Sequence, residues 1–200
     1  MEIEIKLGPA EPQVAFSVYN DTALLPPCGE EEIIVMSTVY YDDIGGNLSS
    51  KKQTLRLRKE NGRSVCCFKS SLQGMTRIEV ECEAEDIHSG SRQLSLHPDV
   101  PGDIAGVLAE STFVPLCEAS YTRKTRMCSR DKITFYLCFD HGYLKRGDDR
   151  EPLCEIELEL CDGEPELLQS VAQEITRKYG LTVCTQSKQQ RAMSVGKTHQ

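Results

Sequence analysis

Charged side chains alternate with apolar ones in several short segments, and this spacing suits metal and phosphate chemistry. Residues 2–7 read Glu-Ile-Glu-Ile-Lys-Leu, and residues 155–160 read Glu-Ile-Glu-Leu-Glu-Leu. Successive side chains of a β-strand point to opposite faces, so each segment would place its acids on one face and its aliphatic residues on the other. Carboxylate oxygens gathered in this way are ligands that Mg²⁺ and Mn²⁺ prefer.

Basic residues follow the same alternation elsewhere. Arg56 and Arg58 alternate with leucines, and Lys124 and Arg126 lie two residues apart. Arginine binds phosphate oxygens with its planar fork, and lysine binds them as a point charge. For any single strand, a solvated outer face is the alternative interpretation. An ordinary surface mixes both signs, so acids and bases on separate strands indicate counter-charges such as a divalent metal and a phosphate chain.

The period of two predicts about eight strands. They cover residues 2–7, 33–41, 53–60, 63–70, 76–83, 120–128, 132–140 and 151–161. Asn61-Gly62 is typical of a tight hairpin, so the strands are expected to be antiparallel. A helix is predicted at 164–179, and weaker helical patterns cover 11–19 and about 101–110. Residues 86–100 read as a loop, for which neither a helix nor a strand is predicted. The role of residues 86–118 stays open.

Composition excludes several classes of protein. A chain of 200 residues with a net charge of −8 indicates one domain and no general nucleic-acid partner. The longest apolar runs are too short for a membrane span, and the acidic N-terminus does not look like a secretory signal, so a cytoplasmic location is expected. The ten cysteines form no C-x-x-C pair and are predicted to be free thiols.

No phosphate-cradling P-loop and no nucleophile elbow occur in the sequence. With these two motifs excluded, the reaction that the charged residues suit is attack on phosphorus by a metal-activated water. Cationic side chains would stabilise the negative charge of the phosphoryl group.

The Glu-x-Glu-x-Lys pattern of residues 2–6 resembles the signature of the CYTH superfamily, the triphosphate tunnel metalloenzymes. Further resemblances follow in the family's order at 55–58, 68–69, 77–81, 124–126, 139–140, 154–159 and 187–191. They cover nearly the whole chain, and the closest likeness is to bacterial inorganic triphosphatases. The resemblance implies a single domain over 1–200 of the α+β class, mainly β. It would be a closed eight-stranded antiparallel barrel with a charged interior and a few helices packed outside.

The resemblance also implies a role for each matching residue, with one or two Mg²⁺ or Mn²⁺ ions as cofactor. The implied metal ligands are Glu2, Glu4, Asp140, Glu155 and Glu157. The implied phosphate-binding residues are Lys6, Arg56, Arg58, Lys69, Lys124, Arg126, Lys188 and Arg191. The implied catalytic centre is Lys6, Glu4, Glu157 and Asp140. Glu79, Glu81 and Glu159 would support these groups or bind a second metal.

The expected function is metal-dependent hydrolysis of inorganic tripolyphosphate or a related triphosphate. A class IV-type adenylyl cyclase and a thiamine triphosphatase are the alternatives within the family. Both need a site for an organic group, whereas only 6% of the residues are aromatic and they form no obvious patch. A non-catalytic polyphosphate-binding module is the alternative of another class, and the complete carboxylate set argues against it. The expected partner is a small triphosphate, with neither nucleic acid nor membrane, and a homodimer is left open.

Overall fold

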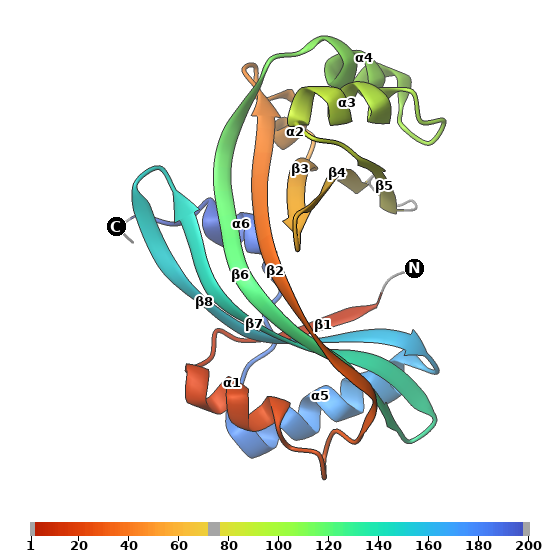
Figure 1. Ribbon diagram of the computed structural model, residues 1–200, viewed down its shortest axis with the longest axis vertical. Helices are drawn as coiled ribbons and strands as arrows, with labels where there is room; N and C mark the ends of the chain where they lie inside the picture. Colours follow the sequence, from red (N-terminus) through yellow and green to blue (C-terminus); the bar gives the residue numbers. More distant parts are fainter. Residues whose placement is uncertain (1–2, 72–76, 198–200) are drawn as a thin grey trace. The chain divides into compact units, whose positions relative to one another are not determined.

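The computed structural model describes residues 3–71 and 77–197 and contains strands and helices in the order drawn in Figure 1. The strands are β1 Glu4–Leu7, β2 Pro27–Asp43, β3 Gln53–Glu60, β4 Arg63–Ser71, β5 Arg77–Glu83, β6 Phe113–Arg130, β7 Ile133–Arg146 and β8 Asp149–Asp162. The helices are α1 Pro12–Tyr19, α2 Asn47–Ser50, α3 Ile87–Ser95, α4 Gly102–Glu110, α5 Pro165–Tyr179 and α6 Lys188–Ala192.

The strands form one sheet in the order β1-β8-β7-β6-β2-β3-β4-β5. The registers of β1 with β8, β2 with β3, β3 with β4 and β4 with β5 are antiparallel. The predicted eight strands are therefore confirmed, but hydrogen-bonded closure into a barrel is not found in the described part of the chain. β1 and β5 are the two edge strands of this order. Residues 182–184 lie along the outer edge of β1. There the Gly8 N–H donates to the Thr182 carbonyl and the Cys184 N–H to the Lys6 carbonyl, both at 2.9 Å.

Contacts divide the chain into two compact units. The first unit comprises Met1–Val35, Tyr121–Tyr143 and Glu151–Ser187, and the second comprises Met36–Ser120, Leu144–Arg150 and Lys188–Gln200. The single domain over 1–200 stays a prediction. No helix within the described ranges combines the length and the apolar character that crossing a membrane requires.

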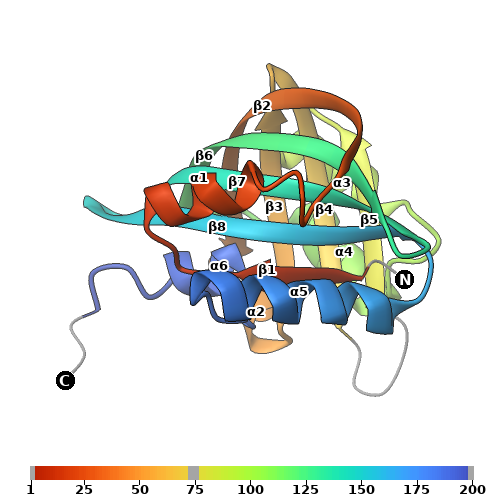
Figure 2. The same ribbon diagram turned by 90° about the horizontal axis from the view of Figure 1, so that it is seen from below.

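The core of the first unit lies between its strands and two helices. Leu7, Ile156 and Leu158 are fully buried there, against Leu168 and Ile175 of α5. Figure 2 shows α5 running along β1 and β8. The helix begins with a proline in its first turn and ends at a glycine with a φ of 71°, a conformation that glycine adopts without strain. The helix predicted at 164–179 is thus confirmed.

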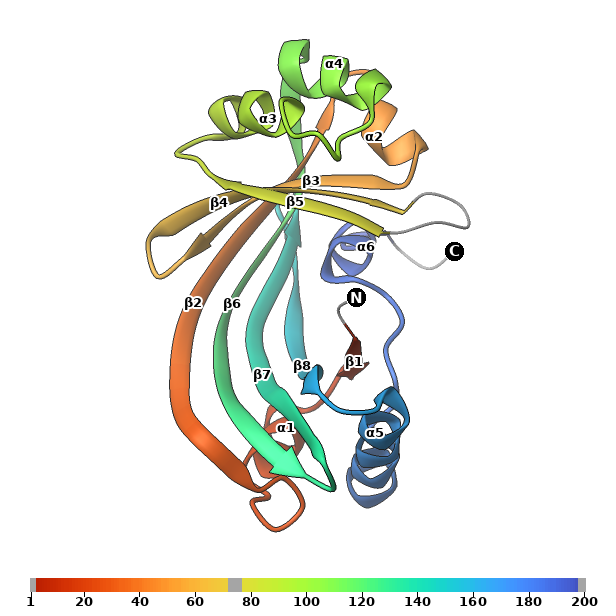
Figure 3. The ribbon, with the colours of Figure 1, turned by 90° about the vertical axis from the view of Figure 1, so that its right-hand side faces the viewer.

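The core of the second unit forms on one face of β3, β4 and β5. Leu55, Phe68 and Val80 occupy aligned positions on these strands and pack in one cluster with the buried side chains of α3 and α4. Figure 3 shows α3 and α4 over the same face. α3 lies in the stretch that the sequence left unassigned. The Asp86 carboxylate caps this helix by accepting from the backbone N–H groups of His88 and Ser89 at 2.8 and 2.9 Å.

Candidate functional site

Pairing of β1 with β8 places the predicted acids of the first unit on one face. Glu4 lies opposite Glu159, and Lys6 lies opposite Glu157. The intervening aliphatic residues of both strands turn into the core that α1 and α5 cover. The alternation in the sequence therefore separates a charged face from an apolar one, as expected.

Two overlapping groups of carboxylates form on this charged face. Asp140, Glu155 and Glu157 bring one oxygen each within 4.8 Å of the others, and Glu4, Glu157 and Glu159 do the same. Glu157 belongs to both groups. Asp140 and Glu155 are fully buried and Glu157 is 2% exposed. The structure thus brings together four of the five predicted metal ligands; the fifth, Glu2, lies outside the described residues.

The crowding of these acids changes their electrostatics. Burial and the nearby charge of Glu157 raise the pKa of Glu4 to about 7, although Lys6 acts in the opposite direction. The Lys6 ammonium lies 3.0 Å from a Glu4 carboxylate oxygen. At Glu4 the negative charge of Glu157 thus outweighs the positive charge of Lys6, and acids crowded in this way suit a hard cation.

Arg123 is a residue of this cluster that the sequence reasoning missed. Its Nε and Nη2 donate to the two carboxylate oxygens of Asp140 at 2.8 Å each, and its Nη1 donates to Glu159 at 2.8 Å. Nη2 also contacts Glu157. Burial acts to lower the pKa of the Arg123 guanidinium, but the hydrogen bonds and charges of its partners outweigh this and raise it.

Lys124 and Arg126 lie on the same strand as Arg123 but, among the described residues, do not contact the two carboxylate groups. Arg126 donates to the backbone carbonyl of Tyr19, and its guanidinium carbon lies 4.6 Å from the centre of the Tyr19 ring. Lys124 lies 3.8 Å from Glu31. Tyr19 is the last residue of α1 and belongs to the core of the first unit, so Arg126 makes its contacts on the apolar face of the sheet. The structure does not bring these two residues to the carboxylates, and their role in phosphate binding stays a prediction.

The second unit presents its own charged face on β3, β4 and β5. The strand registers align Arg56 with Cys67 and Glu81, and Lys69 with Glu79. An Arg56 Nη2 lies 3.6 Å from Glu81 and 3.9 Å from Glu79, and Lys69 also pairs with Glu79. Each of the two glutamates therefore lies against a predicted phosphate-binding cation, and their supporting role stays a prediction.

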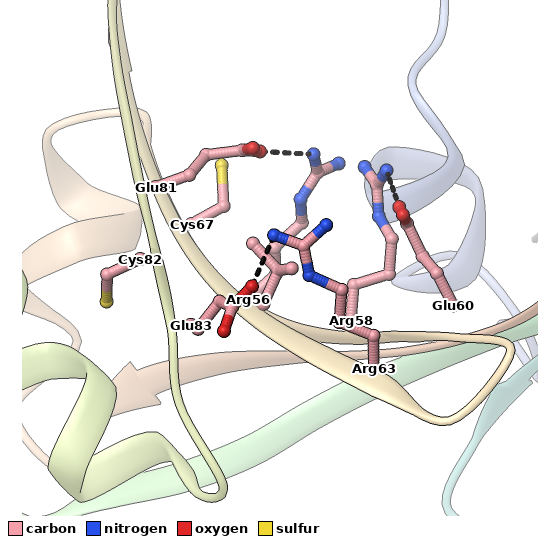
Figure 4. Close-up of a pocket in the computed structure, with 9 residues that line it drawn as sticks. Arg56, Arg58, Glu60, Arg63, Cys67, Glu81, Cys82 and Glu83 are labelled. Atoms are coloured by element: carbon pink, nitrogen blue, oxygen red, sulfur yellow. Dashed lines mark hydrogen bonds and ion pairs between the residues drawn. The ribbon is translucent and has the colours of Figure 1, made fainter.

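This face contains a pocket of about 370 Å³, which is within the usual range of small-molecule sites. Figure 4 shows three arginine side chains within it. Arg58 pairs with Glu60 at 2.8 Å, and Arg63 pairs with Glu83. Arg63 was not predicted, because it follows the hairpin turn and is flanked by no other basic residue. The lining residues are Arg56, Arg58, Glu60, Arg63, Val65, Cys67, Glu81, Cys82 and Glu83.

Lys188 of α6 is a buried lysine in the second unit, 9% exposed. Gln189 beside it accepts a 2.7 Å hydrogen bond from the Thr54 hydroxyl, which ties α6 to β3. Burial raises the pKa of Tyr40, while the positive charges of Arg56 and Lys188 act to lower it. Lys188 therefore shares the surroundings of Tyr40 with a predicted phosphate-binding arginine. Arg191, the last predicted cation, lies partly buried on the same helix.

The cysteines are free thiols in the structure, as predicted. Cys67 lies in the arginine-lined pocket, where burial raises its pKa to about 12. A thiol with this pKa stays protonated near neutral pH and is a poor nucleophile and metal ligand.

A family model described as the CYTH domain matches residues 1–193. The chain is also similar to an inorganic triphosphatase of Haemophilus influenzae. The two are 23% identical over 168 residues, which are 81% of this chain and 46% of that protein. The chain therefore spans about half the length of this curated relative.

Solved structures resemble the fold over nearly its whole length. A putative adenylyl cyclase from Hippeastrum with a dominant triphosphatase activity is 21% identical, covers 94% of this chain and 93% of its own, and has a TM-score of 0.63. A putative adenylate cyclase from Bacillus halodurans is 16% identical, with 96% of each chain covered and a TM-score of 0.59. At these identities the likeness is one of fold.

Proposed function

Because the chain belongs to the CYTH domain family, we propose that it is a metal-dependent hydrolase of inorganic tripolyphosphate or a related triphosphate. The observation that carries the proposal is the pair of carboxylate groups that share Glu157. The name of the Haemophilus influenzae relative and the triphosphatase activity of the Hippeastrum protein support it. The closed tunnel that the family resemblance implies remains part of the proposal.

The donor atoms of the first unit fit a hard divalent cation. Five carboxylates of the two groups face two cations, Lys6 and Arg123, which leaves three formal negative charges (five minus two). Glu4, Asp140, Glu155 and Glu157 would hold one or two Mg²⁺ or Mn²⁺ ions, together with Glu2. When bound, such an ion lowers the pKa of a coordinated water and polarises a phosphoryl oxygen.

The cations of the chain bind and orient the phosphates in this proposal. Arg56 and Arg58 offer guanidinium forks in the pocket of the second unit, and Lys69, Lys188 and Arg191 add positive charge from the same unit. Glu79 and Glu81 orient Arg56 through their ion pairs, so that its donors are already positioned when a phosphate arrives. In the first unit, Lys6, Lys124 and Arg126 remain proposed phosphate ligands.

An adenylyl cyclase is the alternative that the names of the two solved relatives raise. None of the described residues lining the pocket is aromatic, so the pocket offers no ring on which an adenine could stack. This favours an inorganic chain over a nucleotide. The cytoplasmic location, the lack of nucleic-acid and membrane partners and the homodimer all remain predictions.

A matrix of metals and substrates tests the proposal. Phosphate release from tripolyphosphate, ATP and thiamine triphosphate is measured with Mg²⁺, Mn²⁺ or excess chelator, and Glu157→Gln purified in the same way controls for contaminating phosphatases. We expect tripolyphosphate to be hydrolysed fastest and only with metal. Equal or faster turnover of ATP, or full activity in chelator, contradicts the proposal. Cyclic AMP as a product identifies a cyclase, and binding without turnover identifies a polyphosphate-binding module.

A further inference from the structure

Arg123 occupies the centre of the carboxylate cluster in the first unit. Its guanidinium holds both oxygens of Asp140 at 2.8 Å, one oxygen of Glu159 at 2.8 Å, and Glu157. The Arg123 side chain is 13% exposed, and those of Asp140 and Glu157 are 0% and 2% exposed. A network of this kind is strongly held, because a buried carboxylate without a cation is costly.

Two of the three carboxylates that Arg123 holds, Asp140 and Glu157, are among the residues proposed to hold the metal. Asp140 is in one carboxylate group, Glu159 is in the other, and Glu157 is in both. A carboxylate oxygen that accepts a charge-assisted hydrogen bond is a weaker donor to a metal, and two neighbouring cations repel each other. The guanidinium and a divalent ion therefore compete for the same ligands.

We propose that Arg123 is an internal counter-cation that sets the metal affinity of this site, and that metal binding requires its guanidinium to release Asp140 and Glu157. The inference rests on the metal requirement in the proposed function. In the metal-free protein Arg123 neutralises the buried acids, so the site stays folded without an ion. Once displaced, the guanidinium lies beside the occupied site as a cation.

Metal binding to the substrate-free protein tests this directly. Mn²⁺ is titrated into wild type and Arg123→Met by calorimetry, with circular dichroism as the check on folding. We expect Arg123→Met to bind Mn²⁺ at least about tenfold more tightly, because the competing charge is gone. Arg123→Lys keeps a charge without the fork and is expected to fall between them. Arg130→Met is the matched control, since Arg130 lies on the same strand but pairs with Asp131 and Glu174. Its affinity should equal that of wild type.

A second measurement uses wild type alone, in case Arg123→Met does not fold. The Nε–H of Arg123 donates to Asp140. Its NMR signal, measured in protein with isotope-labelled arginine and assigned by connection to the backbone of residue 123, therefore reports this contact. Saturating Mg²⁺ should shift this resonance or speed its exchange with water. An unchanged resonance, or an Arg123→Met protein that binds Mn²⁺ no more tightly than wild type or not at all, overturns the inference. Tripolyphosphate hydrolysis without metal would instead overturn the proposed function.

Discussion

Replacing Lys188 by methionine removes a single buried charge and keeps most of the side-chain volume. Lys188 is 9% exposed and lies near Tyr40 together with Arg56 and Arg58. An ordinary surface lysine in a C-terminal segment would be solvated and its loss would have little effect. In the proposed function the ammonium instead contacts a phosphate, so its loss removes stabilisation of both the bound substrate and the transition state.

The size of the effect follows from the charge and its burial. Two unit charges about 4 Å apart interact by about 4 kcal/mol at an effective dielectric constant of about 20, and by about 1 kcal/mol in bulk water. A mostly buried lysine lies between these limits, and part of the energy is lost to desolvation. We therefore expect kcat/KM for tripolyphosphate to fall by at least about tenfold, which corresponds to about 1.4 kcal/mol.

The assay measures initial rates of phosphate release at low ionic strength, where charge contacts are least screened. Lys197→Met is the matched control, because Lys197 lies nine residues later in the same unit and is exposed. Melting temperatures of both variants separate a loss of binding from a loss of folding. If Lys188→Met retains the wild-type kcat/KM, Lys188 does not contact the substrate and the assignment of α6 to the site is wrong.

Three further predictions concern the metal site, the thiols and the core. Glu4→Gln and Glu157→Gln should each lower kcat by at least about a hundredfold, since each removes the charge of a proposed metal ligand; near-normal rates at saturating metal would assign them structural roles. Thiol counting under denaturing, non-reducing conditions should return ten free thiols, and a reproducible intramolecular disulfide would contradict this. Phe68→Ala should lower the free energy of unfolding by about 3–5 kcal/mol in urea titrations, because Phe68 is fully buried beneath α3 and α4. A loss below about 1 kcal/mol would show that this core is packed differently.

The alternation of residue types predicted the strands well wherever one face is apolar. β3 begins and ends at the predicted residues 53 and 60, and the helix predicted at about 101–110 is α4. β2 begins at Pro27 instead of 33, because residues 28–32 read Cys-Gly-Glu-Glu-Glu and have no apolar alternation. α3 was missed because it is short and rich in serine, and because its fit to the sheet depends on the small size of Gly90 against Cys66.

The site was harder to predict than the strands because it depends on how strands pair. Alternation placed Glu157 and Glu159 on one face of their strand, and the pairing of β1 with β8 puts Glu4 on the same face. The family resemblance assigned Lys124 and Arg126 to the site, and Arg123, which alternation places on the opposite face of the same strand, was not considered. Which of the two faces meets the acids depends on the neighbouring strands. Only the structure shows that Arg123 reaches Asp140. Barrel closure likewise depends on pairing between the two edge strands, β1 and β5, which no local pattern of residues determines.

The shortness of β1 has a consequence for local unfolding. β1 has four residues, Glu4–Leu7, and lies between β8 and residues 182–184, yet it carries both Glu4 and Lys6. A single local opening would remove an acid and a base from the site together, and hydrogen exchange of the β1 amides would report it. An ion held partly by Glu4 binds only the closed strand, so at a concentration of 100 Kd it adds about 2.7 kcal/mol to the cost of opening. In the proposed function, cation occupancy and the order of β1 are therefore thermodynamically linked.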